Sequence, residues 1–410
     1  MEGSFIDVDT GDGSMRAWVT TPPAGSGPGI VLLQEIFGLN DFMRATAARL
    51  AEEGYVCIVP DLFWRLEPGV ALDPAEIERA QALRARFDVT RGVADIAATI
   101  HALRAHPAHT GKVAAVGFCL GGLLATLSAA AGAVDCAVSY YGTGLDAHRG
   151  ALDAVACPMV FHVGDADAKV PAAARELLVA ASAAHPHLHT FVYPDCGHAF
   201  ANPARESWNK PAAMMAYSRT MALLREVMGP IYDLSSLWDA HTAHEFATRD
   251  VDATMATMVD EPYVNHIPTM TGGVGHDHLK RFYKYHFVDS NPPDTRLIPV
   301  SRTVGADRLV DEMVFCFTHT CEIPWMLPGI EPTGRYVEIP LVAIVNFRGD
   351  RLYHEHIYWD QASVLVQIGL LDARGLPVAG IETAKKLVDE TLPSNTLMGD
   401  LWAASEGKPL

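Results

Sequence analysis

The chain has 410 residues, too many for one ordinary hydrophobic core, which predicts two domains. Its formal net charge of −18, without any lysine- or arginine-rich run, argues against a nucleic-acid partner. The first residues lack the pattern of a signal peptide, and no apolar run is long enough to span a bilayer. Seven scattered cysteines without a Cys-x-x-Cys pair are typical of free thiols in a reducing compartment. We therefore expect a cytoplasmic protein with no membrane association, no nucleic-acid partner, no metal and no cofactor.

Short apolar runs alternate with amphipathic stretches through the first half of the chain. After an opening hairpin within residues 1–27, buried strands are expected at 29–34, 55–60, 113–116, 136–141, 159–164 and 189–193. Alternation of this kind predicts a doubly wound, mostly parallel sheet. Active sites in such sheets lie beyond the carboxyl ends of the strands.

One of these strand ends has the pattern of a nucleophile elbow. Small apolar residues at 113–116 predict a strand, and the alanine-rich run at 123–131 predicts a helix. A Gly-x-Cys-x-Gly-Gly turn (117–122) joins them, with cysteine where serine is usual. The start of the helix would favour the thiolate form of Cys119. A buried core cysteine beside a tight turn is the alternative interpretation.

Two later strand ends carry residues that could activate a thiol. Asp165 and Asp167 follow the strand at 159–164, and His198 follows the strand at 189–193. The chain order of nucleophile, acid and histidine is that of the α/β-hydrolase triad. A thiol nucleophile requires such a histidine base and orienting carboxylate. Either aspartate could be the acid, and each of these residues taken alone could be an ordinary loop residue.

Four motifs make residues 1–228 similar to the dienelactone hydrolase (carboxymethylenebutenolidase) family. The motifs are Gln-Glu-Ile-Phe-Gly-Leu-Asn at 34–40, Gly-Phe-Cys-Leu-Gly-Gly at 117–122, Asp-Ala-Lys-Val-Pro at 167–171 and Gly-His-Ala-Phe at 197–200. The resemblance implies an α/β-hydrolase domain over 1–229. It also implies a triad of Cys119, His198 and Asp167.

The resemblance assigns a further role to Glu35, which matches a family glutamate that holds the thiol in the resting enzyme. Substrate binding then swings the cysteine toward the histidine. The oxyanion hole would use the backbone N–H of Leu120, because that residue follows the nucleophile. The resemblance adds the N–H of Ile36. A helix cap or a loop salt bridge is the alternative for Glu35.

One position departs from the family pattern. Dienelactone hydrolases bind the substrate carboxylate with arginines, one of them four residues after the histidine, where this chain has Asn202. Arg79, Arg84 and Arg205 could substitute, or could be ordinary surface arginines. Because bidentate carboxylate binding needs a guanidinium, the resemblance predicts the reaction class more firmly than the substrate.

The composition changes after a helix expected at 214–228, so a second domain is expected over 233–410. Helices are expected within 234–259, at 278–285 and at 383–390, with a loop at 265–273. Alternating strands are expected at 313–319, 336–347 and 352–359. Helices followed by an antiparallel meander predict an α+β domain.

Residues 233–375 resemble the SnoaL-like polyketide cyclases of the nuclear-transport-factor-two-like superfamily. The similarity rests on His-Glu-His-Ile-Tyr-Trp-Asp at 354–360 and Gln-Ile-Gly at 367–369. It implies a curved sheet wrapped by helices into a cone, with Asp360 as general acid/base and His266 at the cone mouth. His354 and His356 share one face of a strand, but no further metal ligands are evident, so no metal site is predicted.

We therefore expect a cysteine hydrolase that acts on small lactones or activated enol esters through a thioester acyl-enzyme. Two alternatives place the function in the second domain. One is a ligand-binding or scaffolding protein whose hydrolase half is inactive. The other is an isomerase or cyclase that uses Asp360. A homodimer through the second domain is a further option.

Overall fold

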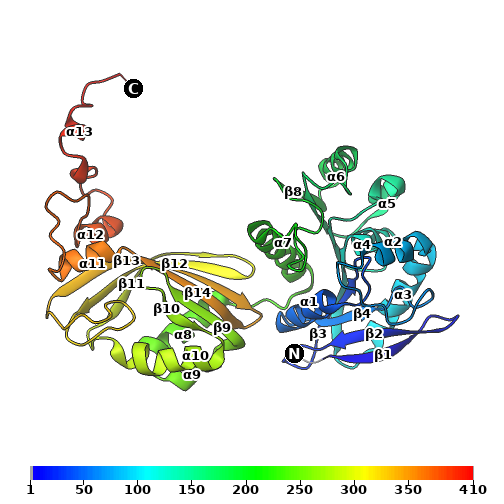
Figure 1. The fold of residues 1–410 in the computed structure, drawn as a ribbon, viewed down its shortest axis with the longest axis horizontal. Helices are drawn as coiled ribbons and strands as arrows, with labels where there is room; N and C mark the ends of the chain where they lie inside the picture. Colours follow the sequence, from blue (N-terminus) through cyan, green and yellow to red (C-terminus); the bar gives the residue numbers. More distant parts are fainter. Residues whose placement is uncertain (1–2, 410) are drawn as a thin grey trace. The chain divides into compact units, whose positions relative to one another are not determined.

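The computed structural model describes residues 3–409, which form two compact units that divide between Ile231 and Tyr232 (Figure 1). Each unit has its own sheet and its own hydrophobic core. Within residues 3–409, no helix combines the length and apolar character that crossing a membrane requires.

The first unit is built on an eight-stranded sheet in the order β1-β2-β4-β3-β5-β6-β7-β8. Strands β1 and β2 form an antiparallel hairpin at one edge, and β4, β3 and β5 to β8 are parallel. The strands are β1 (Ser4–Asp9), β2 (Ser14–Thr20), β3 (Gly27–Leu33), β4 (Val56–Pro60), β5 (His109–Phe118), β6 (Cys136–Tyr140), β7 (Met159–Gly164) and β8 (Leu188–Tyr193). The predicted mostly parallel sheet is confirmed.

Helices cover both faces of this sheet, which is why β4, β6 and β7 are buried along their whole length. Figure 1 shows α1 and α7 on one side of the strands and α3 on the other. The helices are α1 (Asp41–Glu52), α2 (Ile77–Arg86), α3 (Val89–Ala105), α4 (Leu120–Ala130), α5 (Arg149–Ala154), α6 (Ala172–Ala184) and α7 (Lys210–Met228). Asn40, Asp88 and Asn209 cap the starts of α1, α3 and α7 by accepting a backbone N–H.

The turn between β5 and α4 depends on two glycines. A Cβ atom on Gly121 would lie 2.2 Å from the carbonyl oxygen of Leu33, and one on Gly117 would lie 1.9 Å from the carbonyl oxygen of Gly121. Because both obstacles are backbone atoms, no side-chain rotation could relieve the overlap. The close approach lets the Gly121 N–H donate to the Gln34 carbonyl at 3.0 Å. The first turn of α4 is thereby attached to the end of β3.

The second unit contains a six-stranded sheet in the order β10-β9-β14-β13-β12-β11. Strands β9 and β14 are parallel and the other neighbours are antiparallel. The strands are β9 (Met258–His266), β10 (Thr271–Val274), β11 (Arg296–Val304), β12 (Arg308–Thr318), β13 (Tyr336–Arg348) and β14 (Arg351–Trp359). The predicted α+β class is confirmed.

Three helices of the second unit, α8, α9 and α10, lie together along one face of its sheet (Figure 1). The helices are α8 (Leu234–Phe246), α9 (Val251–Ala256), α10 (His276–Phe282), α11 (Gln361–Gln367), α12 (Glu382–Val388) and α13 (Asp400–Ala403). Residues along β13 alternate between buried and partly exposed positions, so every second side chain enters the core. The sheet face toward these helices therefore supplies one wall of the core.

The sequence pattern misplaces part of this second sheet. Residues 258–266 form β9, although 258–259 belong to the expected helical segment and 265–266 to the expected loop, and 271–274 form β10 within that loop. Strand β9 pairs in parallel with β14, which is distant in the sequence, so no local hairpin signal marks it. Strand β11 is an edge strand with mostly exposed side chains, and its sequence lacks a buried stripe.

Replacement of Gly121 by alanine is expected to lower the free energy of unfolding of the first unit by about 1–3 kcal/mol, because the new methyl group overlaps the Leu33 carbonyl. Urea unfolding followed by circular dichroism measures the change. Gly150→Ala is the matched control, since nothing lies within 4 Å of a Cβ at that exposed helical position. Equal stability of the two variants would contradict the expected overlap.

Candidate active site

Cys119 occupies the turn between β5 and α4 with φ of 54° and ψ of −111°. Positive φ is uncommon for residues that carry a Cβ, and strained backbone of this kind concentrates at functional sites. The Cys119 N–H donates to the Tyr140 carbonyl at 2.9 Å, which fixes the turn against β6. The side chain is 7% exposed and stands at the start of α4. The helix dipole there favours a thiolate.

Asp167 and His198 come from loops after two different strands and meet beside this turn. Asp167 lies between β7 and α6, and its Oδ1 accepts from the N–H groups of Lys169 and Val170 at 2.7 and 3.2 Å. Its Oδ2 lies 2.8 Å from Nδ1 of His198. Asp165 instead accepts from the Asp195 N–H at 2.7 Å. The structure therefore brings Asp167, and not Asp165, to the histidine.

The imidazole of His198 is strongly influenced by its two neighbours. Burial disfavours the charged ring, but the hydrogen bond to Asp167 and the nearby Cys119 sulfur outweigh burial and raise the pKa of His198 to about 10. The sulfur and the carboxylate thus both lie close to the ring. An imidazolium beside a sulfur is the arrangement that stabilises a thiolate.

Glu35 lies just beyond β3 and is 3% exposed. Its Oε2 accepts from Nδ2 of Asn202 at 2.9 Å, and its Oε1 has no hydrogen-bond partner among the described residues. Burial raises the pKa of Glu35, while Asn202 and Arg205 partly oppose that shift. Asn202 therefore contacts the buried carboxylate directly.

Tyr141 is a buried residue of the site that sequence reasoning missed. Burial and the negative charges of Glu35 and Cys119 raise the pKa of its hydroxyl far above the usual value, so the hydroxyl lies close to both. Its ring contacts the His198 ring edge-on at 5.2 Å between centroids. Tyr141 could have been predicted as a site residue from its position at the carboxyl end of the strand next to the elbow, where active sites of such sheets lie.

Two backbone N–H groups near the thiol donate no hydrogen bond to any carbonyl of the described residues. They belong to Ile36, in the turn after β3, and to Leu120, the first residue of α4. Each of these N–H groups belongs to the residue directly after a predicted catalytic residue: Ile36 follows Glu35, and Leu120 follows Cys119. Such unpaired donors can stabilise a developing oxyanion.

The three candidate arginines differ in surroundings. Arg79 pairs with the exposed carboxylates of Glu67 and Glu76. Arg84 lies half-buried near the end of α2. Arg205 lies 5.1 Å from the Phe37 ring centre, and its charge lowers the pKa of Glu35. Of these three arginines, Arg205 is the one whose charge lowers the pKa of Glu35.

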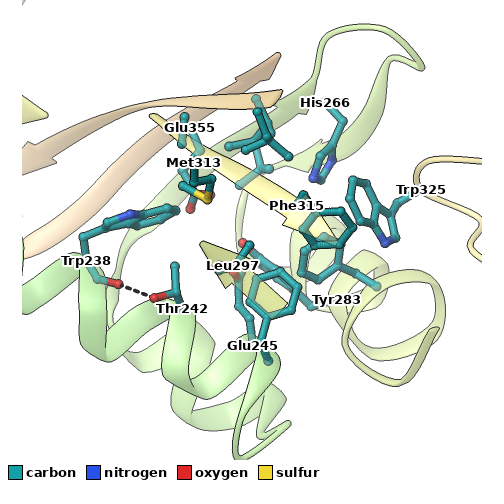
Figure 2. A pocket seen from close by; sticks show the side chains of 16 residues that line it. Trp238, Thr242, Glu245, His266, Tyr283, Leu297, Met313, Phe315, Trp325 and Glu355 are labelled. Atoms are coloured by element: carbon teal, nitrogen blue, oxygen red, sulfur yellow. Dashed lines mark hydrogen bonds between the residues drawn. The ribbon is translucent and has the colours of Figure 1, made fainter. Parts of the chain in front are cut away.

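The second unit has a pocket between its sheet and helices (Figure 2). The lining is mostly aromatic and aliphatic, with the side chains of Glu245, His266 and Glu355 projecting toward the same space. Burial lowers the pKa of His266 to about 4, so its ring is neutral. Asp360 does not line the cavity. It caps α11 by accepting from the Ala362 N–H at 2.9 Å and from the Ser363 hydroxyl at 2.7 Å.

A buried polar cluster in this unit was also missed from the sequence. Nε2 of His241 lies 3.2 Å from Glu245 Oε1 and 3.3 Å from Glu355 Oε1. Burial lowers the pKa of His241, but the two carboxylates outweigh it and raise that pKa to about 10. His241 and Glu245 are four residues apart in an expected helix and therefore lie on the same face of it, so their spacing could have indicated part of the cluster.

A parallel sheet with an elbow, an acid and a histidine at three strand ends defines the first unit as an α/β hydrolase. The family model of the dienelactone hydrolase family matches residues 15–228, and that of the SnoaL-like domain matches residues 239–355. The first model covers more than half of the chain, so the chain belongs to the dienelactone hydrolase family. Its first unit is a hydrolase of ester or lactone bonds, and both predicted resemblances are confirmed.

Individual relatives match the first unit. A carboxymethylenebutenolidase of Pseudomonas putida is 41% identical over 223 residues, which cover 53% of this chain and 94% of that protein. Another, from Pseudomonas sp. (strain P51), is 40% identical over 233 residues, or 56% of this chain and 97% of that protein. A crystal structure from Klebsiella pneumoniae subsp. pneumoniae MGH 78578, assigned as a dienelactone hydrolase, has a TM-score of 0.50 and 25% identity. It covers 55% of this chain and 98% of its own.

Asp167→Asn is expected to give a pH-dependent loss of stability. The folded pKa of His198 is raised to about 10, above its ordinary value of 6.5. Protonated His198 therefore stabilises the fold fully below pH 6.5, and this contribution is lost as the pH rises through about 10. The difference in unfolding free energy between wild type and Asp167→Asn should therefore shrink from pH 6.5 toward pH 10. Urea unfolding across that window measures it. Asp165→Asn is the control, and an equal pH trend in both variants would contradict the assignment.

Proposed function

We propose that the first unit hydrolyses small lactones or activated enol esters, with Cys119 as the nucleophile. The observation that carries the proposal is the position of Cys119 at a strained helix start beside a histidine whose Nδ1 lies 2.8 Å from Asp167 Oδ2. A thiol becomes a strong nucleophile as the thiolate, and His198 can hold the proton. Asp167 orients the ring and stabilises the imidazolium.

The reaction takes two steps. The Cys119 sulfur attacks the carbonyl carbon, and the N–H groups of Ile36 and Leu120 donate to the oxyanion that forms. The carbon–oxygen bond of the lactone then breaks, and His198 gives its proton to the departing enol oxygen. A water that loses its proton to His198 next attacks the thioester, which releases the acid and the thiol.

Glu35 is proposed to hold the Cys119 proton in the resting enzyme. Its carboxylate is buried, retains one unpaired oxygen and has a raised pKa, all of which favour proton binding. Asn202 supports this role by donating to Oε2 at 2.9 Å without adding a charge. An arginine at that position would favour the ionised carboxylate, whereas the neutral amide leaves it more basic.

Arg205 is proposed to bind the carboxylate of acidic substrates. It lies close enough to Glu35 to lower that residue's pKa, and Asn202 cannot offer a guanidinium fork. The proposed substrate is therefore a small lactone or ester. Arg205 favours substrates that carry a carboxylate near the scissile bond.

Cys119→Ala is expected to lower kcat/KM for dienelactone and for 4-nitrophenyl acetate by at least about 10³-fold, because no other group can form the acyl-enzyme. Steady-state hydrolysis assays measure this loss. Cys196→Ala serves as the control, since that thiol is buried and has no place in the proposed site. Undiminished turnover in Cys119→Ala would overturn the proposed nucleophile.

Arg205→Gln is expected to raise KM for dienelactone, which carries a carboxylate, by roughly tenfold to a hundredfold, the equivalent of one charge-assisted hydrogen bond. The KM for neutral 4-nitrophenyl acetate should change little. Arg79→Gln is the matched control because its guanidinium pairs with Glu67 and Glu76. Equal effects on both substrates would assign Arg205 a structural role instead.

A further inference from the structure

The cavity of the second unit has two carboxylates in a mostly aromatic and aliphatic wall, and His241 lies behind them. Glu245 from α8 and Glu355 from β14 both line the cavity, and they are 3% and 2% exposed. His241 has 0% exposure and presents Nε2 to both carboxylates. Charged groups buried to this degree need compensation by an opposite charge.

The hydrogen bond at Nδ1 of His241 fixes the tautomer of the neutral ring, because it determines which ring nitrogen carries the hydrogen. The hydroxyl of Thr257 donates to the Thr254 carbonyl at 2.6 Å, so its oxygen accepts from Nδ1–H of His241, also at 2.6 Å. In the neutral ring Nε2 then carries the lone pair. Either a proton or a metal ion must lie between Nε2 and the two carboxylate oxygens, since a bare lone pair would be repelled by them. A histidine whose far nitrogen is held by a hydrogen bond is also how metal-ligating histidines are oriented.

We propose that His241, Glu245 and Glu355 bind one divalent metal ion of the Zn²⁺ or Mn²⁺ type at the wall of this cavity. One ligand atom from each residue lies within 4.8 Å of the others. Ligands about 2.0–2.1 Å from a tetrahedral zinc lie about 3.3 Å apart, which agrees with the observed 3.2 and 3.3 Å from Nε2 to the two carboxylates.

One oxygen of this cluster is poorly satisfied by hydrogen bonds. Oε1 of Glu355 is fully buried, and although it lies 3.3 Å from Nε2 of His241, it accepts no hydrogen bond from the described residues. An unpaired buried oxygen in the wall of a cavity is available for a ligand.

The geometry leaves a coordination position on the cavity side. His241 approaches from behind the wall, and the two carboxylates come from the wall itself, so the remaining position faces the apolar space. A water or a carbonyl oxygen of an apolar small molecule could occupy it, as in metal sites with three protein ligands. The site lies in a different unit from Cys119 and is independent of the hydrolase proposal.

The test uses the full chain, treated with chelator and then titrated with Zn²⁺ by calorimetry and with Mn²⁺ by electron paramagnetic resonance. Mn²⁺ discriminates against thiolates, so the cysteines do not compete for it. We expect one ion per chain, a rise in the thermal midpoint of wild type on binding, and at least about a hundredfold weaker binding in Glu355→Gln and Glu245→Gln.

Glu331→Gln is the matched control, because that carboxylate is exposed and belongs to the same unit. Circular dichroism and near-ultraviolet tryptophan signals report whether each variant folds, and the wild-type titration decides the question even if a variant does not. Absence of binding by wild type overturns the proposal, as does equal affinity in Glu331→Gln and Glu355→Gln. A proton that stays on Nε2 of His241 in excess metal, seen by nitrogen-15 NMR, would show that an imidazolium occupies the position instead.

Discussion

The close approach of the first turn of α4 to the end of β3 is the constraint on which the active site depends. Gly121 approaches the Leu33 and Gln34 carbonyls so closely that no side chain fits there, and its N–H bonds to Gln34. Cys119 is therefore held at a positive φ between the strand and the helix. Glu35 and Ile36 follow Gln34 in the chain, so the same contact joins the segment that carries them to the first turn of α4, which follows Cys119.

The charges around this turn are arranged so that protons can move between buried groups. Glu35 is stabilised by the neutral amide of Asn202 and not by a guanidinium in direct contact, so burial dominates and its pKa rises. His198 has the opposite surroundings, since Asp167 gives its ring a negative partner. The raised pKa values of these two groups therefore have different causes, which are burial for Glu35 and the contacts with Asp167 and Cys119 for His198.

The sequence allows much of the first unit to be predicted, because its signals are local. Each parallel strand is a short apolar run, and each candidate residue directly follows such a run. The chain order alone left both Asp165 and Asp167 open, and only the family resemblance selected Asp167, since the choice depends on which carboxylate turns toward a loop about thirty residues away. Tyr141 escaped notice for a similar reason: an aromatic residue after an apolar strand resembles core until its neighbours across the sheet are known.

The second unit was predicted less completely because its decisive contacts are not local. Strand β9 is held by parallel pairing with β14, and β11 lies at an exposed edge. The alternation of side chains along β14 matters most for its chemistry. His354 and His356 attract attention as a pair, yet Asn346 bonds His354, and Glu355, which points to the opposite face, reaches the cavity. The wall of that cavity offers the carboxylates of Glu245 and Glu355 and the ring of His266 to a polar ligand, whereas Asp360 does not line the cavity and instead caps α11.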